Sequence, residues 1–273
     1  MELNNKHTAV IGVGVLILVF LGFAIWYMAT HQAPAPVGPI TAATSTPTTG
    51  TGAGPQKIVD NGAYYEITAT YPGSTLLRQT SSPQADAAAV ATLKTFVEQQ
   101  ITRFKDNGNF ANLTPQDVQM QGLDQGRKYA FQAEYKTYQG THTVSYVYTL
   151  YEDTLGAHPN TYYRTFTFDT ATGQAIELSD LFTSGTYLER LSTVARTDLP
   201  TIIRMMSGSD ADTDYIASGT LPEADSFQNW YLDGAALVLV FPPYQVGPYS
   251  LGTVLNPIPL SKLSDILKAI YVP

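Results

Sequence analysis

The sequence predicts an α+β fold in which antiparallel sheet packs against helices, arranged as two consecutive lobes and preceded by one transmembrane helix. Three observations predict this fold. Runs that alternate apolar and polar residues are joined by short turns, which is typical of antiparallel strands. Two longer stretches place apolar residues every three or four positions, as amphipathic helices do. Near the N-terminus, a 20-residue segment without a charge has the length of a membrane span.

The apolar segment runs from Ala9 to Met28 and contains neither a charge nor a proline. A helix of this length spans the bilayer core of roughly 30 Å. Lys6 precedes it and no Lys or Arg follows closely, so residues 1–6 are expected as a short cytoplasmic tail. We expect residues 7–30 to be an uncleaved signal anchor in the cell membrane, with the rest of the chain extracytoplasmic. The alternative is a cleaved signal peptide, whose apolar region is usually shorter.

Residues 31–55 lack Asp, Glu, Lys and Arg and consist mainly of Thr, Pro, Ala and Gly. Such a stretch cannot bury enough apolar surface to offset the entropy lost on ordering. We therefore expect a disordered linker that holds the folded part away from the membrane.

The first half of the folded part predicts a strand, a helix and a hairpin. Residues 64–71 are rich in β-forming side chains. A helix over 83–108 begins after a serine cap with a proline and ends at Asn107-Gly108. Alternating residues on both sides of Gln139-Gly140 predict a hairpin. One face of the helix is formed by Val90, Leu93, Val97, Ile101 and Phe104.

The second half also mixes strands and helices. In order, it predicts a strand at 162–168, a short helical segment at 179–182, a helix from Tyr187, a hairpin over 227–241 that turns at Asp233-Gly234, a strand at 253–259, and a closing helix from Ser261 to Ile270.

Composition excludes several classes of protein. Lys and Arg total 15 and Asp and Glu total 23, which gives a net charge of −8. An excess of acidic residues argues against a nucleic-acid partner, because phosphate attracts Lys and Arg. The chain has no cysteine, so a disulfide framework, a thiolate nucleophile and a cysteine-ligated metal are excluded.

The sequence contains no recognisable motif for catalysis or cofactor binding. The folded part holds only His142 and His158, which do not have the spacing of a zinc pair. A serine-hydrolase elbow, a phosphate-binding loop and a dinucleotide fingerprint are all missing. We expect no cofactor, no metal and no enzymatic activity. Carboxylate pairs for glycoside cleavage stay open, since their separation is spatial.

The spacing Asp210-x-Asp212-x-Asp214 matches the first half of a calcium-binding loop. The pattern then fails, because Tyr215 stands where glycine is needed and Leu221 where glutamate is needed. A solvated acidic loop is therefore expected there.

The segment from Pro242 to Tyr249 is the candidate recognition loop. Three prolines stiffen it, and its two tyrosines offer wide contact area at a small entropic cost, which suits binding. The alternative is that both tyrosines pack on the domain. The candidate ligand- or partner-binding residues are Tyr244, Val246, Gly247, Pro248 and Tyr249. Eight further tyrosines between Tyr129 and Tyr163 could stack sugars, although cross-strand packing explains most of them.

Four motifs occur in a fixed order. They are Gly156-Ala-His158-Pro159, Phe166-x-Phe168-Asp169 with Thr172-Gly173, Ile176-x-Leu178-x-Asp180-Leu181-Phe182, and Tyr244-x-Val246-Gly247-Pro248-Tyr249-x-x-Gly252. This order resembles the extracytoplasmic domain family shared by the RsiV anti-sigma factor, which binds lysozyme, and the PdaC peptidoglycan deacetylase. The resemblance implies a PdaC-like N-terminal α+β lobe at 56–154 and an RsiV-like C-terminal α+β domain at 155–273.

The resemblance implies a membrane-anchored binding or sensor module outside a bacterial cell, whose partner is a lysozyme-like protein or peptidoglycan. Residues 1–6 are too short for the sigma-binding segment of RsiV, and the separate catalytic domain of PdaC is not expected here. A cell-wall-acting enzyme related to peptidoglycan hydrolases or deacetylases, or a structural envelope protein, is the alternative.

Overall fold

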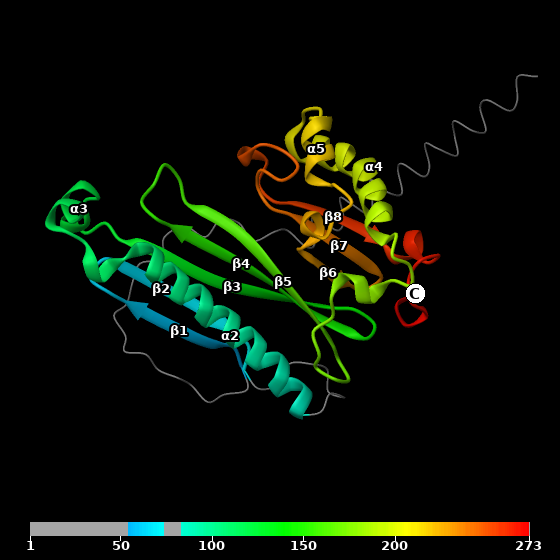
Figure 1. The fold of residues 1–273 in the computed structure, drawn as a ribbon, viewed down its shortest axis with the longest axis horizontal. Coiled ribbons are helices and arrows are strands. Elements are labelled where there is room, and N and C mark those ends of the chain that lie inside the picture. Colours follow the sequence, from blue (N-terminus) through cyan, green and yellow to red (C-terminus); the bar gives the residue numbers. More distant parts are fainter. Residues whose placement is uncertain (1–53, 74–82, 273) are drawn as a thin grey trace, which may run out of the picture. The chain divides into compact units, whose positions relative to one another are not determined.

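The computed structural model describes residues 54–73 and 83–272, and all of them fall within one compact unit (Figure 1). Two sheets, paired mainly antiparallel, pack against helices, which confirms the α+β class. The predicted anchor at 7–30 lies outside the described residues, as does nearly all of the linker. In the described part, no helix has both the length and the hydropathy needed to cross a bilayer.

The first sheet has five strands in chain order. They are β1 (Gln56–Asn61), β2 (Tyr65–Tyr71), β3 (Tyr129–Gln139), β4 (Thr143–Asp153) and β5 (Asn160–Asp169). All neighbours are antiparallel except β2 and β3, which are parallel. The predicted strands and the hairpin at Gln139-Gly140 are confirmed. The edge strand β1 was not predicted from the sequence.

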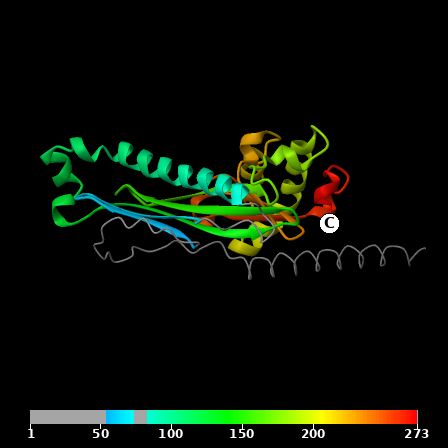
Figure 2. The ribbon, with the colours of Figure 1, turned by 90° about the horizontal axis from the view of Figure 1, so that it is seen from below.

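The long helix α2 (Pro83–Gly108) lies across one face of this sheet, as Figures 1 and 2 show. Four members of its predicted apolar stripe, Leu93, Val97, Ile101 and Phe104, are buried, and Val90 is half-buried. Phe104 contacts Phe131 of β3 with ring centroids 5.5 Å apart. The short helix α3 (Pro115–Met120) follows and completes the crossover to β3. A crossover of this kind is what parallel pairing of β2 and β3 requires.

Two tyrosines of β4 pack their rings into this core and leave their hydroxyl groups without hydrogen bonds in the described part of the chain. Tyr146 and Tyr148 are fully buried, and neither hydroxyl has a hydrogen-bond partner among the described residues. Burial raises the pKa of both phenols far above the usual value. The alternating tyrosines of this strand therefore serve packing, as the sequence predicted for most of them.

We expect Tyr148→Phe to raise the free energy of unfolding by about 1 kcal/mol, because it removes a buried hydroxyl that gains nothing in the folded state. Urea denaturation of the full chain measures this change. Tyr129→Phe is the control, since the Tyr129 hydroxyl donates to Gln121 Oε1 and its loss should destabilise. A loss of stability in Tyr148→Phe equal to that of the control would contradict the prediction.

The second sheet has three antiparallel strands, β6 (Trp230–Asp233), β7 (Ala236–Phe241) and β8 (Val254–Pro259). The helices α4 (Tyr187–Ser207) and α5 (Thr213–Gly219) form a second core with it. The α4 side of this core is built by Leu191, Ala195, Leu199, Ile202 and Ile203. The predicted helix from Tyr187 and the predicted hairpin turning at Asp233-Gly234 are confirmed.

The two sheets are joined by hydrogen bonds from the backbone of β6. The N–H groups of Trp230 and Leu232 donate to the hydroxyls of Thr165 (2.9 Å) and Ser145 (3.2 Å) on the first sheet. The rings of Tyr138 and Tyr231 also meet here, with centroids 4.3 Å apart. The expected lobe boundary after residue 154 falls between the paired strands β4 and β5, so the first sheet includes residues expected in the second lobe.

Three expectations were wrong. The closing helix from Ser261 to Ile270 is instead two 3-10 turns, Leu260–Leu263 and Ala269–Tyr271. The intervening backbone pairs with a distant segment: Lys268 N–H donates to Leu181 O and Thr183 N–H donates to Ile266 O. The strand expected from 227 begins only at Trp230, after a 3-10 turn. The expected acidic loop contains the helix α5, which Asp212 caps.

Candidate functional site

The loop between β7 and β8 carries all five residues that the sequence predicted for binding. Gly252 adopts φ 72° and ψ −152°, a region that only glycine enters readily, and so the loop can return to β8. A side chain on Gly247 would collide with Leu251, because an added Cβ would lie 2.7 Å from its Cδ2. The glycines of the motif therefore shape the loop.

Gln245 fastens this loop to the rest of the second core. Its side-chain Nε2 donates to the carbonyl oxygens of Gly219 (2.9 Å) and Ser226 (2.8 Å). At Gly219 the two backbones approach so closely that an added Cβ would lie 1.9 Å from the Gln245 carbonyl oxygen. The loop is thus held against the C-terminal end of α5 without room for a side chain.

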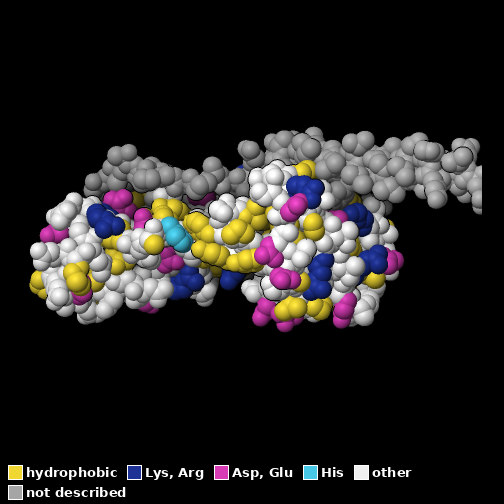
Figure 3. All heavy atoms as spheres, turned by 90° about the horizontal axis from the view of Figure 1, so that it is seen from above, with side chains coloured by type: hydrophobic (Ala, Val, Ile, Leu, Met, Phe, Trp, Pro, Cys, Tyr) yellow, Lys and Arg dark blue, Asp and Glu magenta, His cyan; other side chains and the backbone are white. Residues whose placement is uncertain are grey.

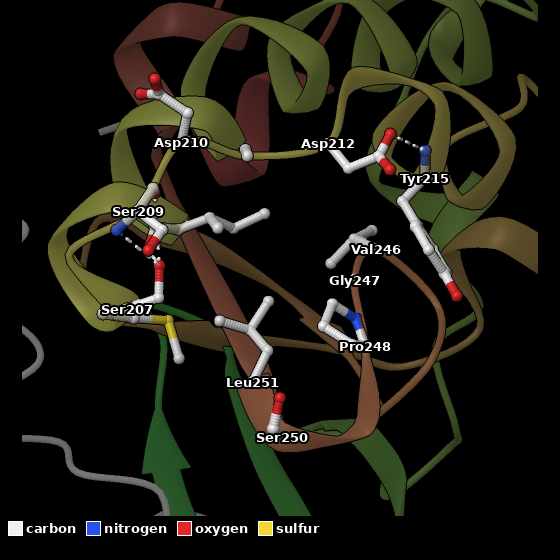
Figure 4. A pocket seen from close by; sticks show the side chains of 13 residues that line it. Ser207, Ser209, Asp210, Asp212, Tyr215, Val246, Gly247, Pro248, Ser250 and Leu251 are labelled. Atoms are coloured by element: carbon white, nitrogen blue, oxygen red, sulfur yellow. Dashed lines mark hydrogen bonds between the residues drawn. The ribbon is translucent and has the colours of Figure 1, made fainter.

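Val246, Gly247 and Pro248 line a pocket of about 480 Å³ (Figure 4). The opposite wall is formed by the end of α4, the turn after it and the start of α5. Its apolar members are Ile203, Met206, Ala211 and Tyr215, and its hydroxyl groups come from Ser207 and Ser209. Ser250 and Leu251 add to the wall on the side of the β7–β8 loop. Met206 and Tyr215 are 40% and 39% exposed, so apolar surface is open to a ligand here. Mixed apolar and hydrogen-bonding walls are typical of small-molecule sites.

The two acidic residues of the pocket have different surroundings. Asp212 caps α5: its Oδ1 accepts the N–H groups of Asp214 (2.9 Å) and Tyr215 (3.3 Å). Asp210 pairs with Arg204 and turns its carboxylate away from Pro248 and Leu251 (Figure 4). Among the described residues, no group of three or more His, Asp or Glu could hold a metal ion. Both carboxylates of the pocket thus have partners within the protein.

The two tyrosines of the loop lie outside this pocket and form an aromatic group with His158 of the β4–β5 turn. Tyr249 stacks on His158 at 4.4 Å between ring centroids, and its hydroxyl donates to Pro159 O (3.0 Å). The ring centroids of Tyr244 and Tyr249 are 5.5 Å apart, and Tyr244 is 58% exposed. The structure thus divides the predicted residues between a pocket wall and an aromatic group.

Sequence reasoning missed the opposite wall of the pocket. Its residues come from the end of one helix and the start of the next, and spacing alone does not reveal that this turn faces a loop more than thirty residues later. The one sequence signal for this wall is the acidic spacing Asp210-x-Asp212. The structure brings them to the same pocket as Val246, Gly247 and Pro248.

Comparison with known proteins gives this arrangement a family context. Residues 179–261 match the family described as "Protein of unknown function (DUF3298)". The DUF3298 match covers the segment from the 3-10 turn before α4 to the end of β8, and so includes both walls of the pocket. It confirms the resemblance seen in the sequence.

Two relatives extend the comparison. The chain is 27% identical over 184 residues to "Peptidoglycan-N-acetylmuramic acid deacetylase PdaC" of Bacillus subtilis (strain 168). That alignment covers 67% of this chain and 37% of PdaC, so the chain spans little more than a third of that relative. A crystal structure of a DUF3298 family protein from Pseudomonas aeruginosa PAO1 superposes with a TM-score of 0.52 at 17% identity. It covers 81% of this chain and 97% of its own, and it shows a shared fold.

Proposed function

We propose that this protein is a membrane-anchored, extracytoplasmic binding or sensor module of the bacterial cell envelope, whose pocket receives part of peptidoglycan. The observation that carries the proposal is the pocket of about 480 Å³ that the family motif builds against α4 and α5. Its apolar floor and hydroxyl rim suit a ligand that presents both carbon faces and amide or hydroxyl groups. The similarity to PdaC, whose name places its substrate in peptidoglycan, supports the choice of ligand.

We further propose that the pocket binds without catalysing a reaction. Asp212 uses one carboxylate oxygen to cap α5, and Asp210 is paired with Arg204. A general acid or base needs a proton-transfer group aimed at the ligand, and these two carboxylates have other partners. The remaining polar groups at the pocket are hydroxyls and backbone amides, which bind and orient.

We expect Ser250→Trp to lower the affinity for peptidoglycan at least tenfold. Ser250 is exposed at the edge of the pocket, and an indole there occupies space that a ligand needs. Tenfold corresponds to about 1.4 kcal/mol of binding free energy. The full chain, purified in detergent, is sedimented with insoluble peptidoglycan and the bound fraction is measured against protein concentration.

Ser261→Trp is the matched control, because Ser261 is also an exposed serine at a 3-10 turn but does not line the pocket. It should bind as the unaltered chain does. If the unaltered chain does not sediment with peptidoglycan, or if both tryptophan variants bind equally well, the pocket is not the site for this ligand.

The net charge of −8 favours a second candidate, a basic lysozyme-like protein, since opposite charges steer association. Immobilised lysozyme in the same assay separates the two. Retention on lysozyme that falls steeply with added salt, with no binding to peptidoglycan, would favour the protein partner.

A further inference from the structure

The aromatic group beside the pocket is held in an unusual way. Tyr244 has φ +72°, in the left-handed region that residues other than Gly, Asn and Asp rarely adopt. Leu155, in the β4–β5 turn, has φ +59°, so both of the loops that meet at Tyr249 and His158 contain a left-handed non-glycine residue. Such backbone persists only where the surroundings impose it, and it is often found at functional sites.

The strain at Tyr244 does not serve the core of the domain. Tyr244 is 58% exposed, so the left-handed backbone carries a largely solvent-exposed aromatic residue. Gln245 follows Tyr244 directly, and its side chain donates hydrogen bonds to the carbonyl oxygens of Gly219 and Ser226. These bonds hold the backbone at Tyr244 in place. A strained backbone that carries an exposed aromatic side chain contributes little to folding, and this combination favours a role in binding.

Behind Tyr244, the supporting rings are fixed. The hydroxyl of Tyr249 donates to Pro159 O, and the Tyr249 ring stacks on His158 at an interplanar angle of 29°. Tyr244 is tilted by 35° from Tyr249. Figure 3 shows hydrophobic side chains gathered in a band across one face of the molecule, with acidic side chains at one end of the band. A fixed platform loses little entropy when a ligand settles on it.

The chemistry of the platform selects its occupant. Stacked bases of a nucleic acid are disfavoured, because a chain of net charge −8 repels the phosphates that accompany them. A pyranose ring is uncharged, and its C–H groups, which carry a slight positive charge, complement the negative face of an aromatic ring. The Tyr244 hydroxyl can bond to a sugar hydroxyl, whereas the Tyr249 hydroxyl already donates to Pro159 O.

We propose that Tyr244, Tyr249 and His158 form a saccharide-stacking subsite, on which a sugar ring of the glycan strand lies next to the pocket. Pro248 lines the pocket and Tyr249 follows it directly, so the subsite and the pocket adjoin on one loop. The proposal rests on the proposed function for its ligand, and it names the part of that ligand which the aromatic group takes.

The test uses N-acetylglucosamine oligomers, which carry the sugar of a cell-wall glycan without its peptide, titrated calorimetrically into the full chain in detergent. Tyr244→Asn removes the ring while keeping a residue that tolerates the left-handed backbone. We expect at least a tenfold rise in Kd with an unchanged or higher Tm. Tyr244→Phe retains the ring and should stay within about threefold of the unaltered chain, because stacking needs no hydroxyl.

Tyr64→Ala is the control, since it removes a half-buried tyrosine at the β1–β2 turn. The proposal is overturned if Tyr244→Asn binds the oligomers as well as the unaltered chain does, or if the unaltered chain binds none. It is also overturned if Tyr244→Asn weakens binding to lysozyme alone. If Ser250→Trp weakens binding to peptidoglycan and Tyr244→Asn does not, the proposed function is supported and the saccharide-stacking subsite is ruled out.

Discussion

Gly219→Ala should destabilise the fold by about 3 kcal/mol, near the upper end of the usual cost of overpacking. The added Cβ would lie 1.9 Å from the carbonyl oxygen of Gln245 and 2.7 Å from its carbonyl carbon. Both are backbone atoms, so the collision cannot be relieved by turning a side chain. The β7–β8 loop must move away from α5 as a whole.

The same substitution should weaken binding in the pocket, because the displaced loop carries Val246, Gly247 and Pro248 with it. Urea denaturation measures the loss of stability, and sedimentation with peptidoglycan measures the loss of binding. Gly185→Ala is the matched control: an added Cβ there meets nothing within 4 Å, so its stability should be unchanged. If the two alanine variants have equal free energies of unfolding, the prediction is wrong and the β7–β8 loop can move away from α5 without loss of stability.

Lys262→Met should lower the free energy of unfolding by about 3 kcal/mol at neutral pH, because it leaves the buried carboxylate of Asp198 without its countercharge. The side chain of Asp198 is 7% exposed, and Lys262 Nζ lies 3.3 Å from its Oδ2. Desolvation raises the pKa of Asp198, and the charge of Lys262 opposes that rise. Without the lysine, the pKa of Asp198 should rise further.

The deficit should depend on pH in a defined direction. A carboxyl whose folded-state pKa is raised stabilises the fold fully below its unfolded value of 3.8, and this contribution is lost as pH rises through the folded-state pKa. The free energy of unfolding of Lys262→Met should therefore be far closer to that of the unaltered chain near pH 4 than at pH 7. Adding Asp198→Asn should restore most of the loss at pH 7. A deficit that is the same at both pH values would rule out the buried charge as its cause.

Local pattern was enough to predict most of the elements. The apolar stripe from Val90 to Phe104 predicted α2, and the alternation around Gln139-Gly140 predicted β3 and β4. These signals are strong because every residue of the pattern obeys one period. The segment from Ser261 to Ile270 misled because its apolar spacing is helical, whereas its backbone hydrogen bonds go to Leu181 and Thr183. Partners eighty residues away leave no trace in local periodicity.

The sequence predicted only the part of the candidate site that the β7–β8 loop supplies. The prolines and glycines between β7 and β8 identified the loop in the sequence. The division of its residues between pocket and aromatic group follows from contacts with α5 and with the β4–β5 turn, at Gly219 and Pro159. Those contacts are set by how the second sheet packs on the first, which no short motif encodes.

The hydrogen bonds that β6 makes with the first sheet have a consequence for cooperativity. Backbone amides of β6 are satisfied by the side-chain hydroxyls of Thr165 and Ser145, and the hydroxyls of Ser145 and Thr167 are themselves 2.9 Å apart in the buried interior. Separating the sheets would strand polar groups on both sides at once. We therefore expect the two sheets to unfold together in one cooperative transition rather than one after the other.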